Sequence, residues 1–215
     1  ILFMPVRNVV RVQLANTFYH VYNRGHNKDL LFLYEADYAF FEFLLLRCFG
    51  LEQSKNAEGM LLPWFGDRVQ LNAFCLIPNH FHLLLYQAED ETAISSAMQS
   101  LATTYTVYFN KKHNRRGSAF ESVFKSVLIS SDSYLQHISC YIHLNPNNYK
   151  SWQHSSYSDY KNPASRSWIA SEPILKMFDS RSQYLNFVDD YKSLRDEISN
   201  LKQNLADHAE TCHNT

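Results

Sequence analysis

The sequence predicts an α+β fold, a split β-α-β arrangement of the ferredoxin or RRM-like type, in which helices cover an antiparallel sheet. Two observations support this prediction. Apolar residues follow strand and helix periodicity in the order strand, helix, strand, strand, helix, strand, helix. With 215 residues, of which 46% are hydrophobic and 19% charged, the chain can bury a core of its own. A C-terminal helical extension follows this domain.

The first strand and helix are predicted from a change in periodicity. Aromatic and β-branched residues over 17–23 indicate a strand, and a turn at Gly25 ends it. From Glu35 to Phe49 apolar residues recur at helical spacing. The polar residues 52–67 then predict a loop.

Two further strands are predicted at the centre of the sheet. Residues 69–77 form one apolar run and residues 80–86 form a second, and the two are separated by a turn at Pro78-Asn79. Such runs are typical of strands buried on both faces. We expect these two strands to pair as a hairpin.

A long helix is predicted over residues 92–112, where large apolar side chains recur at spacings of four and three. Basic residues gather at its C-terminal end, where the helix dipole favours cations. The chain as a whole has a net charge of −1 and a pI of about 6.9, which does not favour phosphate binding. A basic run is also typical of a solvated helix end.

The sheet domain closes with a strand over residues 122–129 and a helix that Ser131 caps. This helix is expected to end near Asn145, because Pro146 disfavours helical geometry in the residue before it.

A candidate metal site lies in the second strand of the predicted hairpin. Side chains at i and i+2 of a strand emerge on one face, so His80 and His82 would offer two imidazoles to one ion. The alternative is two polar residues on an exposed face of the sheet.

A candidate nucleophile lies in the last predicted helix. Tyr141 and Asn145 are four residues apart and therefore share one helix face. A tyrosine can attack phosphorus and store the bond as a phosphotyrosine ester, provided that a metal ion assists its weakly acidic hydroxyl. The alternative is a tyrosine that packs its ring and hydrates its hydroxyl.

Three separated motifs and three shorter segments carry a resemblance to a known family. The motifs are Tyr19-His20-Val21-Tyr22-Asn23-Arg24-Gly25, Ala73-Phe74-Cys75-Leu76-Ile77-Pro78-Asn79-His80-Phe81-His82-Leu83-Leu84-Leu85 and Tyr141-Ile142-His143-Leu144-Asn145-Pro146; the segments are Tyr108-Phe109-Asn110, Phe124-Lys125-Ser126 and Ser155-Ser156-Tyr157. In order and rough spacing they resemble the HUH single-tyrosine transposases, most closely the REP-associated tyrosine transposases. The resemblance covers roughly residues 16–190.

The resemblance implies that His80 and His82 bind the metal ion and that Tyr141 is the nucleophile. Asn145 takes the place of the third metal ligand. Such enzymes nick single-stranded DNA beside a hairpin, keep a 5′-phosphotyrosine and leave a free 3′-hydroxyl. They act as homodimers with Mg²⁺ or Mn²⁺, and the REP-associated branch works on repeated extragenic palindromes in bacterial chromosomes. For this chain the sequence leaves open an active or a domesticated transposase.

Two segments depart from the family pattern. The spacer over residues 52–67 is longer than expected. A position that is usually rich in arginine reads Phe-Glu-Ser-Val at residues 120–123, which lowers the expected strength of backbone binding.

The ligand types indicate what the site binds. Two imidazoles and one amide oxygen suit Mn²⁺ better than Mg²⁺, which prefers oxygen ligands and keeps its waters. Basic residues around the site are candidates for contact with the DNA strand, although each is equally typical of a solubilising charge. The candidates are Arg24, Lys111, Lys112, Arg115, Arg116 and Lys125.

We divide the chain into a catalytic domain over residues 4–150 and a C-terminal extension over residues 151–215. Apolar residues from Tyr184 to Leu205 recur at alternating spacings of three and four, which predicts a helix over about 181–206 before a disordered tail. This helix pairs with a second copy in a homodimer or lies across its own domain, and the sequence leaves both open.

Two other functions fit parts of the pattern. A non-catalytic RRM-like module that binds single-stranded nucleic acid shares the layout, but has no need of the histidine pair. A metal-dependent hydrolase needs a general base near the histidines, and the sequence places no carboxylate there.

Composition indicates the setting. No apolar run approaches the ~18 residues of a membrane span and no signal-peptide pattern is present, so we expect a cytoplasmic protein that does not enter a membrane. Met4 is interpreted as the native start. The four cysteines lack CxxC spacing and are expected to be reduced thiols, most of them buried.

Overall fold

The computed structural model describes residues 14–162 and 165–211, with side chains up to residue 196. Its centre is a four-stranded antiparallel sheet with the strand order β2-β3-β1-β4. This topology confirms the predicted α+β fold and its split β-α-β order. The strands are β1 (Thr17–Arg24), β2 (Val69–Ile77), β3 (His80–Gln87) and β4 (Lys125–Ile129).

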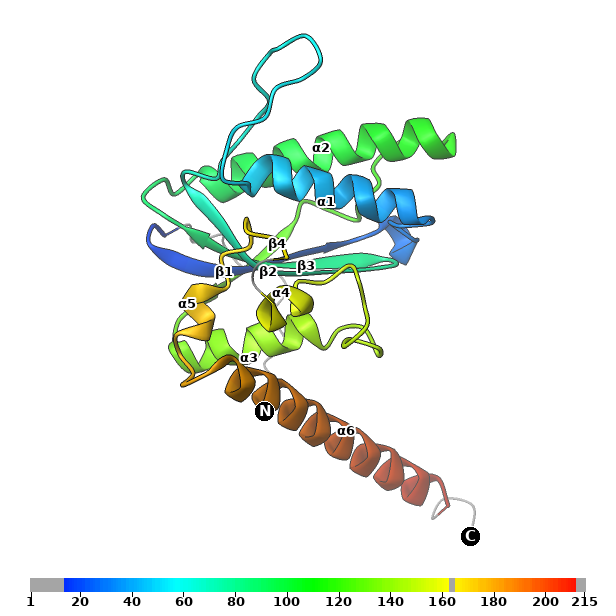
Figure 1. Cartoon of the computed structure of the whole chain (residues 1–215). Helices are drawn as coiled ribbons and strands as arrows, with labels where there is room; N and C mark the ends of the chain where they lie inside the picture. The colour runs from blue at the N-terminus through cyan, green and yellow to red at the C-terminus, as the bar shows by residue number, and fades with distance from the viewer. Residues whose placement is uncertain (1–13, 163–164, 212–215) are drawn as a thin grey trace.

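Helices cover both faces of the sheet (Figure 1). The helices α1 and α2 lie on one face, whereas α3, α4 and α5 lie on the other and α6 extends away from the body of the domain. A 3₁₀ turn, η1 (His26–Lys28), follows β1. The helices are α1 (Glu35–Phe49), α2 (Ala93–His113), α3 (Asp132–His143), α4 (Tyr157–Lys161), α5 (Glu172–Leu175) and α6 (Arg181–Thr211).

The alternation of β3 divides its side chains between two apolar layers. Phe81, Leu83 and Leu85 are buried in the layer with α1 and α2. His82 and Leu84 point to the other face, where Leu84 packs with side chains of α3. Each fully buried Phe or Leu contributes about 1.5–3 kcal/mol. The core therefore fixes the register of β3 and, with it, the face that carries the histidines.

The prediction that both hairpin strands lie at the sheet centre is wrong for β2, which is an edge strand. Its outer edge is nevertheless bonded to later segments of the chain: Leu76 N donates to His154 O at 2.8 Å, and Ala170 N donates to Leu71 O at 2.9 Å. This cover explains why an edge strand is as apolar as a central one. It also joins residues 151–170 of the proposed C-terminal extension to the sheet.

The fourth strand is shorter than predicted, since β4 begins at Lys125 rather than at residue 122. Lys125 pairs with Tyr22, close to the end of β1. Beyond that point the ladder is interrupted: the Asn23 amide donates to Ser122 O at 2.8 Å, and backbone pairing resumes where Glu121 N donates to Arg24 O at 2.9 Å.

Helix α3 begins as predicted, with Ser131 Oγ accepting a hydrogen bond from Tyr134 N at 3.2 Å. It ends at His143, two residues before the expected Asn145. The Asn145 side chain turns back and donates to Tyr141 O at 3.0 Å, so it satisfies a carbonyl of the last turn.

The first turns of α6 pack on their own domain through the buried residues Tyr184 and Val188. Further along, Leu194 is 55% exposed. The helix continues to Thr211, beyond the expected end near 206, because residues 206–211 contain good helix formers and neither Gly nor Pro.

Some sequence-based expectations concern residues outside these limits. Met4, Cys212 and the side chains of Ile198, Leu201 and Leu205 are not among the described parts of the chain. Within them, Cys48, Cys75 and Cys140 are buried free thiols, as predicted. None of the described helices combines the length and the apolarity that crossing a membrane requires.

Candidate active site

The two histidines of β3 lie side by side at one end of the sheet. His80 pairs with Arg24 and His82 with Tyr22 across the β1–β3 ladder. Both imidazoles occupy the face that α3 covers, and their ring centroids are 4.9 Å apart. At this separation two nitrogen atoms can reach one ion with bonds of about 2.1 Å.

Tyr141 approaches the same point from α3. Its ring centroid lies 5.4 Å from that of His82 and 5.9 Å from that of His20, in edge-on contacts. An open pocket of about 290 Å³ separates the helix from the end of the sheet. It is lined by Tyr22, Asn23, Arg24, Lys28, Asn79, His80, His82, Lys125 and Tyr141.

The Nδ1 atom of each histidine has a hydrogen-bond partner behind it. His80 Nδ1 lies 2.8 Å from Asn79 Oδ1, and His82 Nδ1 lies 2.8 Å from His20 Nε2. His82 Nε2 is buried and has no hydrogen-bond partner among the residues that the structure describes. A buried nitrogen of this kind is an available ligand position.

Burial keeps these rings neutral. It lowers the pKa of His82 well below the ordinary value, and the neighbouring His20 and His80 lower it further. Burial also lowers the pKa of His20 to about 3. The pKa of His80 is lowered by burial, with Asn145 opposing the shift. Neutral imidazoles keep the lone pairs that metal binding requires.

The environment of Tyr141 does not ionise its hydroxyl. Burial raises its pKa above the ordinary value, while Arg195 and Asn145 oppose that shift. Arg195 reaches this region from α6, and its Nη2 donates to Leu144 O at 3.1 Å. The phenol is therefore protonated at neutral pH and needs assistance before it can act as a nucleophile.

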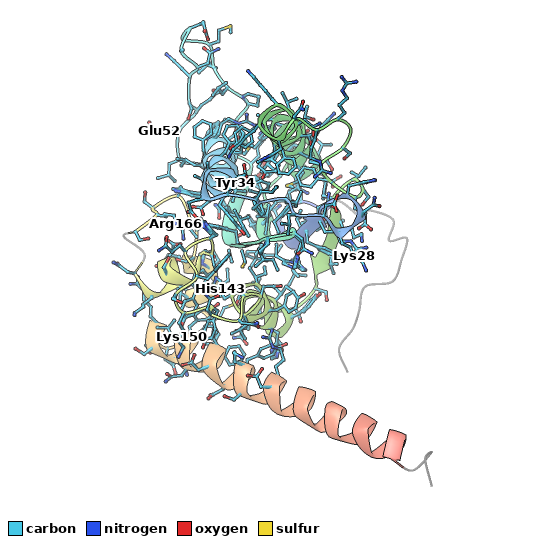
Figure 2. All side chains as sticks on the ribbon, turned by 90° about the vertical axis from the view of Figure 1, so that its right-hand side faces the viewer. Lys28, Tyr34, Glu52, His143, Lys150 and Arg166 are labelled. Atoms are coloured by element: carbon cyan, nitrogen blue, oxygen red, sulfur yellow. The ribbon has the colours of Figure 1, made fainter. Side chains whose placement is uncertain are left out.

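Of the predicted DNA-contacting residues, only Arg24 and Lys125 line the pocket. Arg24 forms a two-point ion pair with Glu121, in which Nη2 donates to Oε1 at 2.6 Å. Lys125 lies 5.9 Å from the centre of the Tyr22 ring. Lys28, which is not among the predicted contacts, also lines the pocket. It lies at the end of the domain that faces the viewer in Figure 2.

The other four predicted contacts lie at the end of α2, outside the pocket lining. Lys112 Nζ donates to the buried Asp37 carboxylate at 2.7 Å, and Arg115 pairs with Asp29 at 3.2 Å. Burial alone would raise the pKa of Asp37, but Lys112 and backbone amides hold it below the ordinary value. Lys111 and Arg116 are exposed. Much of the basic cluster is thus neutralised within the fold.

No role for His20, Tyr22 or Asn79 is predicted from the sequence. A signal for two of them was present, because His20 and Tyr22 share the i, i+2 spacing of His80 and His82. Pairing the two strands side by side in one antiparallel sheet would have brought all four rings to one side of the sheet.

Buried neutral histidines predict that stability falls in mild acid. The pKa of His20 and of His143 is lowered by burial to about 3, so below pH 6.5 the unfolded chain binds protons that the folded chain does not. Lowering the pH from 7 to 5 should cost about 2 kcal/mol for each ring. His154, whose pKa is raised by Glu42 despite its burial, acts in the opposite sense.

Urea unfolding at the two pH values measures this effect. The matched variant is His143→Gln, which can keep bonds to Tyr184 and Ser156 but does not titrate. Its loss of stability between pH 7 and 5 should be smaller than that of the parent by about 2 kcal/mol. Equal losses would show that His143 does not stay neutral when folded.

Residues 66–145 match the family model described as "Transposase IS200 like". No curated protein matches the chain. Among solved structures, the fold is similar to that of a REP-associated tyrosine transposase bound to a REP hairpin, with a TM-score of 0.54 and 14% identity over 73% of this chain and 86% of that one. A candidate transposase from Deinococcus radiodurans R1 aligns with a TM-score of 0.39 and 14% identity, over 61% and 93% of the two chains.

Proposed function

We propose that the chain is a single-tyrosine HUH transposase of the IS200-like family, whose model residues 66–145 match, and that it nicks and rejoins single-stranded DNA through Tyr141. The observation that supports this most is the meeting of three side chains from two elements. His80 and His82 of β3 and Tyr141 of α3 line one pocket at the end of the sheet. A phenol beside two neutral imidazoles is the arrangement that a metal-assisted tyrosine nucleophile needs.

The donor set fits one divalent ion, Mg²⁺ or Mn²⁺. The unpaired Nε2 of His82 is a ligand without a competing partner in the described structure. No three His, Cys, Asp or Glu side chains gather around a point in the described parts of the chain, so a third protein ligand has to be of another type. Asn145 is suited to this role, because its amide nitrogen is held by Tyr141 O and its side chain is within hydrogen-bonding reach of His80. When bound, the ion would neutralise charge on the scissile phosphate.

The proposed reaction exchanges one phosphate ester for another. The Tyr141 hydroxyl gives up its proton to water as its oxygen attacks the scissile phosphorus; a P–O bond to Tyr141 forms and the bond from phosphorus to the 3′-oxygen breaks. The 3′-oxygen takes up a proton and leaves as a free hydroxyl, while the 5′-phosphate remains on the tyrosine. Attack by a 3′-hydroxyl on that ester reverses the step, so rejoining needs no external energy source.

The expected substrate is single-stranded DNA that carries a hairpin, such as a repeated palindrome. The family supports DNA as the partner, and the fold is shared with a protein solved on a REP hairpin. The position of the nucleophile is consistent with a single strand as substrate, since Tyr141 lies in a recess of about 290 Å³ between α3 and the sheet.

The alternative of a non-catalytic RRM-like module fits the structure less well. Such modules stack bases on an open sheet face. Here α1 and α2 cover one face, and α3, α4 and α5 cover the other (Figure 1).

The proposal is tested by a covalent adduct. The protein is incubated with 5′- or 3′-labelled hairpin strands and Mn²⁺, and the products are separated on a denaturing gel. Label should remain with the protein when it lies downstream of the nick and should be released as a shorter strand when it lies upstream. Cleavage without any adduct would favour a hydrolase that activates water.

The position of Lys125 predicts a salt-dependent contribution to strand binding. Lys125→Ala should lower the slope of log K against log salt by about 0.7, the change expected for one phosphate contact on a single strand. Lys112→Ala is the matched control, because the Lys112 ammonium group is bound to Asp37. Its slope should stay unchanged while its stability falls. The reverse pattern in a fluorescence-anisotropy titration would place the strand along α2.

We also propose a homodimer that involves α6. Two active sites in one assembly allow two strand ends to be exchanged, and a two-fold dimer is the commonest way to achieve this. The first turns of α6 are already occupied by contacts within the domain, whereas Leu194 is exposed. The partner surface would therefore lie on the part of α6 beyond Tyr191.

Truncation after Asp190 is expected to weaken self-association, as is the double change Leu194→Asp with Leu201→Asp, because both remove apolar contact from the helix. Analytical ultracentrifugation at micromolar concentration measures this. Lys192→Asp is a control that adds negative charge on the same helix but on a different side from Leu194, at a residue paired with Asp196. A monomeric parent chain, or a dimer unaffected by the truncation, would contradict the proposal.

A further inference from the structure

The hydrogen-bond partner of His82 Nδ1 is chemically different from the partner of His80 Nδ1. His80 Nδ1 faces the side-chain oxygen of Asn79, which can only accept a hydrogen bond. His82 Nδ1 instead faces another imidazole, Nε2 of His20, at 2.8 Å. An imidazole nitrogen can donate or accept, so chemistry alone does not fix where the proton lies.

Only one placement of that proton leaves His82 able to bind metal. Both rings are neutral and carry one N–H each. If His20 Nε2 donated, the proton of His82 would lie on Nε2, which is buried without a partner in the described structure. If His82 Nδ1 donates, Nε2 keeps its lone pair and is open to a cation. With the proton on His82 Nε2, a buried N–H has no acceptor. With the proton on His82 Nδ1, Nε2 is a free metal ligand.

We propose that His20 is a positioning residue for His82: its Nε2 accepts the hydrogen bond from His82 Nδ1–H and thereby directs the His82 Nε2 lone pair at the metal ion. This rests on the proposed function of the site. Metal-bound histidines commonly donate their second N–H to a carboxylate or a carbonyl. Here a third histidine supplies that acceptor, and it lies on a different strand from the ligands.

The surroundings hold His20 in this role. It is buried, with 6% of its surface exposed, and it stacks on His82 with ring centroids 5.0 Å apart and on Tyr22 at the same distance. Its ring therefore has little freedom to turn. Because His20 pairs with Leu84 and Tyr22 with His82 in the ladder, the register of β1 on β3 sets this contact.

The direct test reads the tautomer in the metal-free parent protein. Long-range ¹H–¹⁵N spectra of ¹⁵N-histidine protein distinguish a ring protonated on Nδ1 from one protonated on Nε2, and His82→Ala identifies the His82 signals. We expect His82 to be protonated on Nδ1. A His82 ring protonated on Nε2 would overturn the proposal.

Two substitutions test the consequence for metal binding. His20→Phe keeps a flat ring but removes the acceptor, and Mn²⁺ affinity measured by calorimetry should fall about 10- to 100-fold. His20→Gln can place an amide oxygen close to the position of Nε2, and it should restore affinity to within about threefold of the parent. His137→Phe, on the exposed side of α3, controls for the loss of a histidine elsewhere.

The outcomes separate this inference from the function on which it rests. A parent that binds Mn²⁺ and forms the adduct, with His20→Phe binding equally well, overturns the role of His20 alone. A parent that neither binds Mn²⁺ nor forms the adduct overturns the proposed function and with it the positioning role of His20; the tautomer spectrum then decides only which ring donates in the bond between His20 and His82. If His20→Phe does not fold, as judged by circular dichroism, the parent spectrum and His20→Gln decide.

Discussion

Tyr141→Phe is expected to abolish the covalent adduct while the protein still folds and binds the DNA strand. The change removes one hydroxyl from a half-buried ring and no packing volume. A phenyl ring has no atom that can attack phosphorus, so the loss should reach the detection limit, at least about 10³-fold. Gel assays of adduct and anisotropy measurements of binding report the two effects separately.

Tyr134→Phe is the matched control for this variant. Tyr134 lies two turns earlier on the same helix, is half-buried and also packs against the core beneath α3. Its adduct yield should remain within about twofold of the parent. Parent-like yields from Tyr141→Phe would remove Tyr141 from the mechanism and direct attention to Tyr22, the other tyrosine that lines the pocket.

His80→Ala and His82→Ala should each lower cleavage at least about 100-fold, because a metal ion contributes several kcal/mol of charge stabilisation. Mn²⁺ affinity should fall with cleavage, and added Mn²⁺ should recover part of the activity. Strand binding in the absence of metal should change little, since the rings are neutral.

His137→Ala provides the comparison, because His137 is exposed on α3 and contacts Phe187 and Tyr191 of α6. It should retain parent-like cleavage. Activity that survives in both His80→Ala and His82→Ala at unchanged Mn²⁺ concentration would show that the pair does not bind the essential ion.

The fold was predictable because its signals are local. Strand and helix periodicity can be recognised within about a dozen consecutive residues. The Ser131 cap and Pro146 indicate the limits of α3 without reference to the rest of the chain. The edge position of β2 was not predictable in this way. Its apolar outer edge is bonded to residues near 154 and 170, a pairing about 80 to 100 residues distant in sequence.

In the candidate site, too, the features set by local sequence were predictable and those set by distant contacts were not. The spacing of His80 and His82 on one strand sufficed to place both on one face. The state of the basic cluster did not follow from its sequence, because Lys112 is neutralised by Asp37, a buried carboxylate on another helix. Similarly, His20, the hydrogen-bond partner of His82 Nδ1, lies on β1, 62 residues earlier in the sequence.

Peptide mapping of the adduct tests the central claim most directly. Parent protein is trapped on a hairpin strand with Mn²⁺, digested with protease and nuclease, and the modified peptide is sequenced by mass spectrometry. The account predicts a nucleotide joined through its 5′-phosphate to Tyr141, together with a released strand that ends in a 3′-hydroxyl. A phosphate linked to any other residue, or a released strand that ends in a 3′-phosphate, would contradict it.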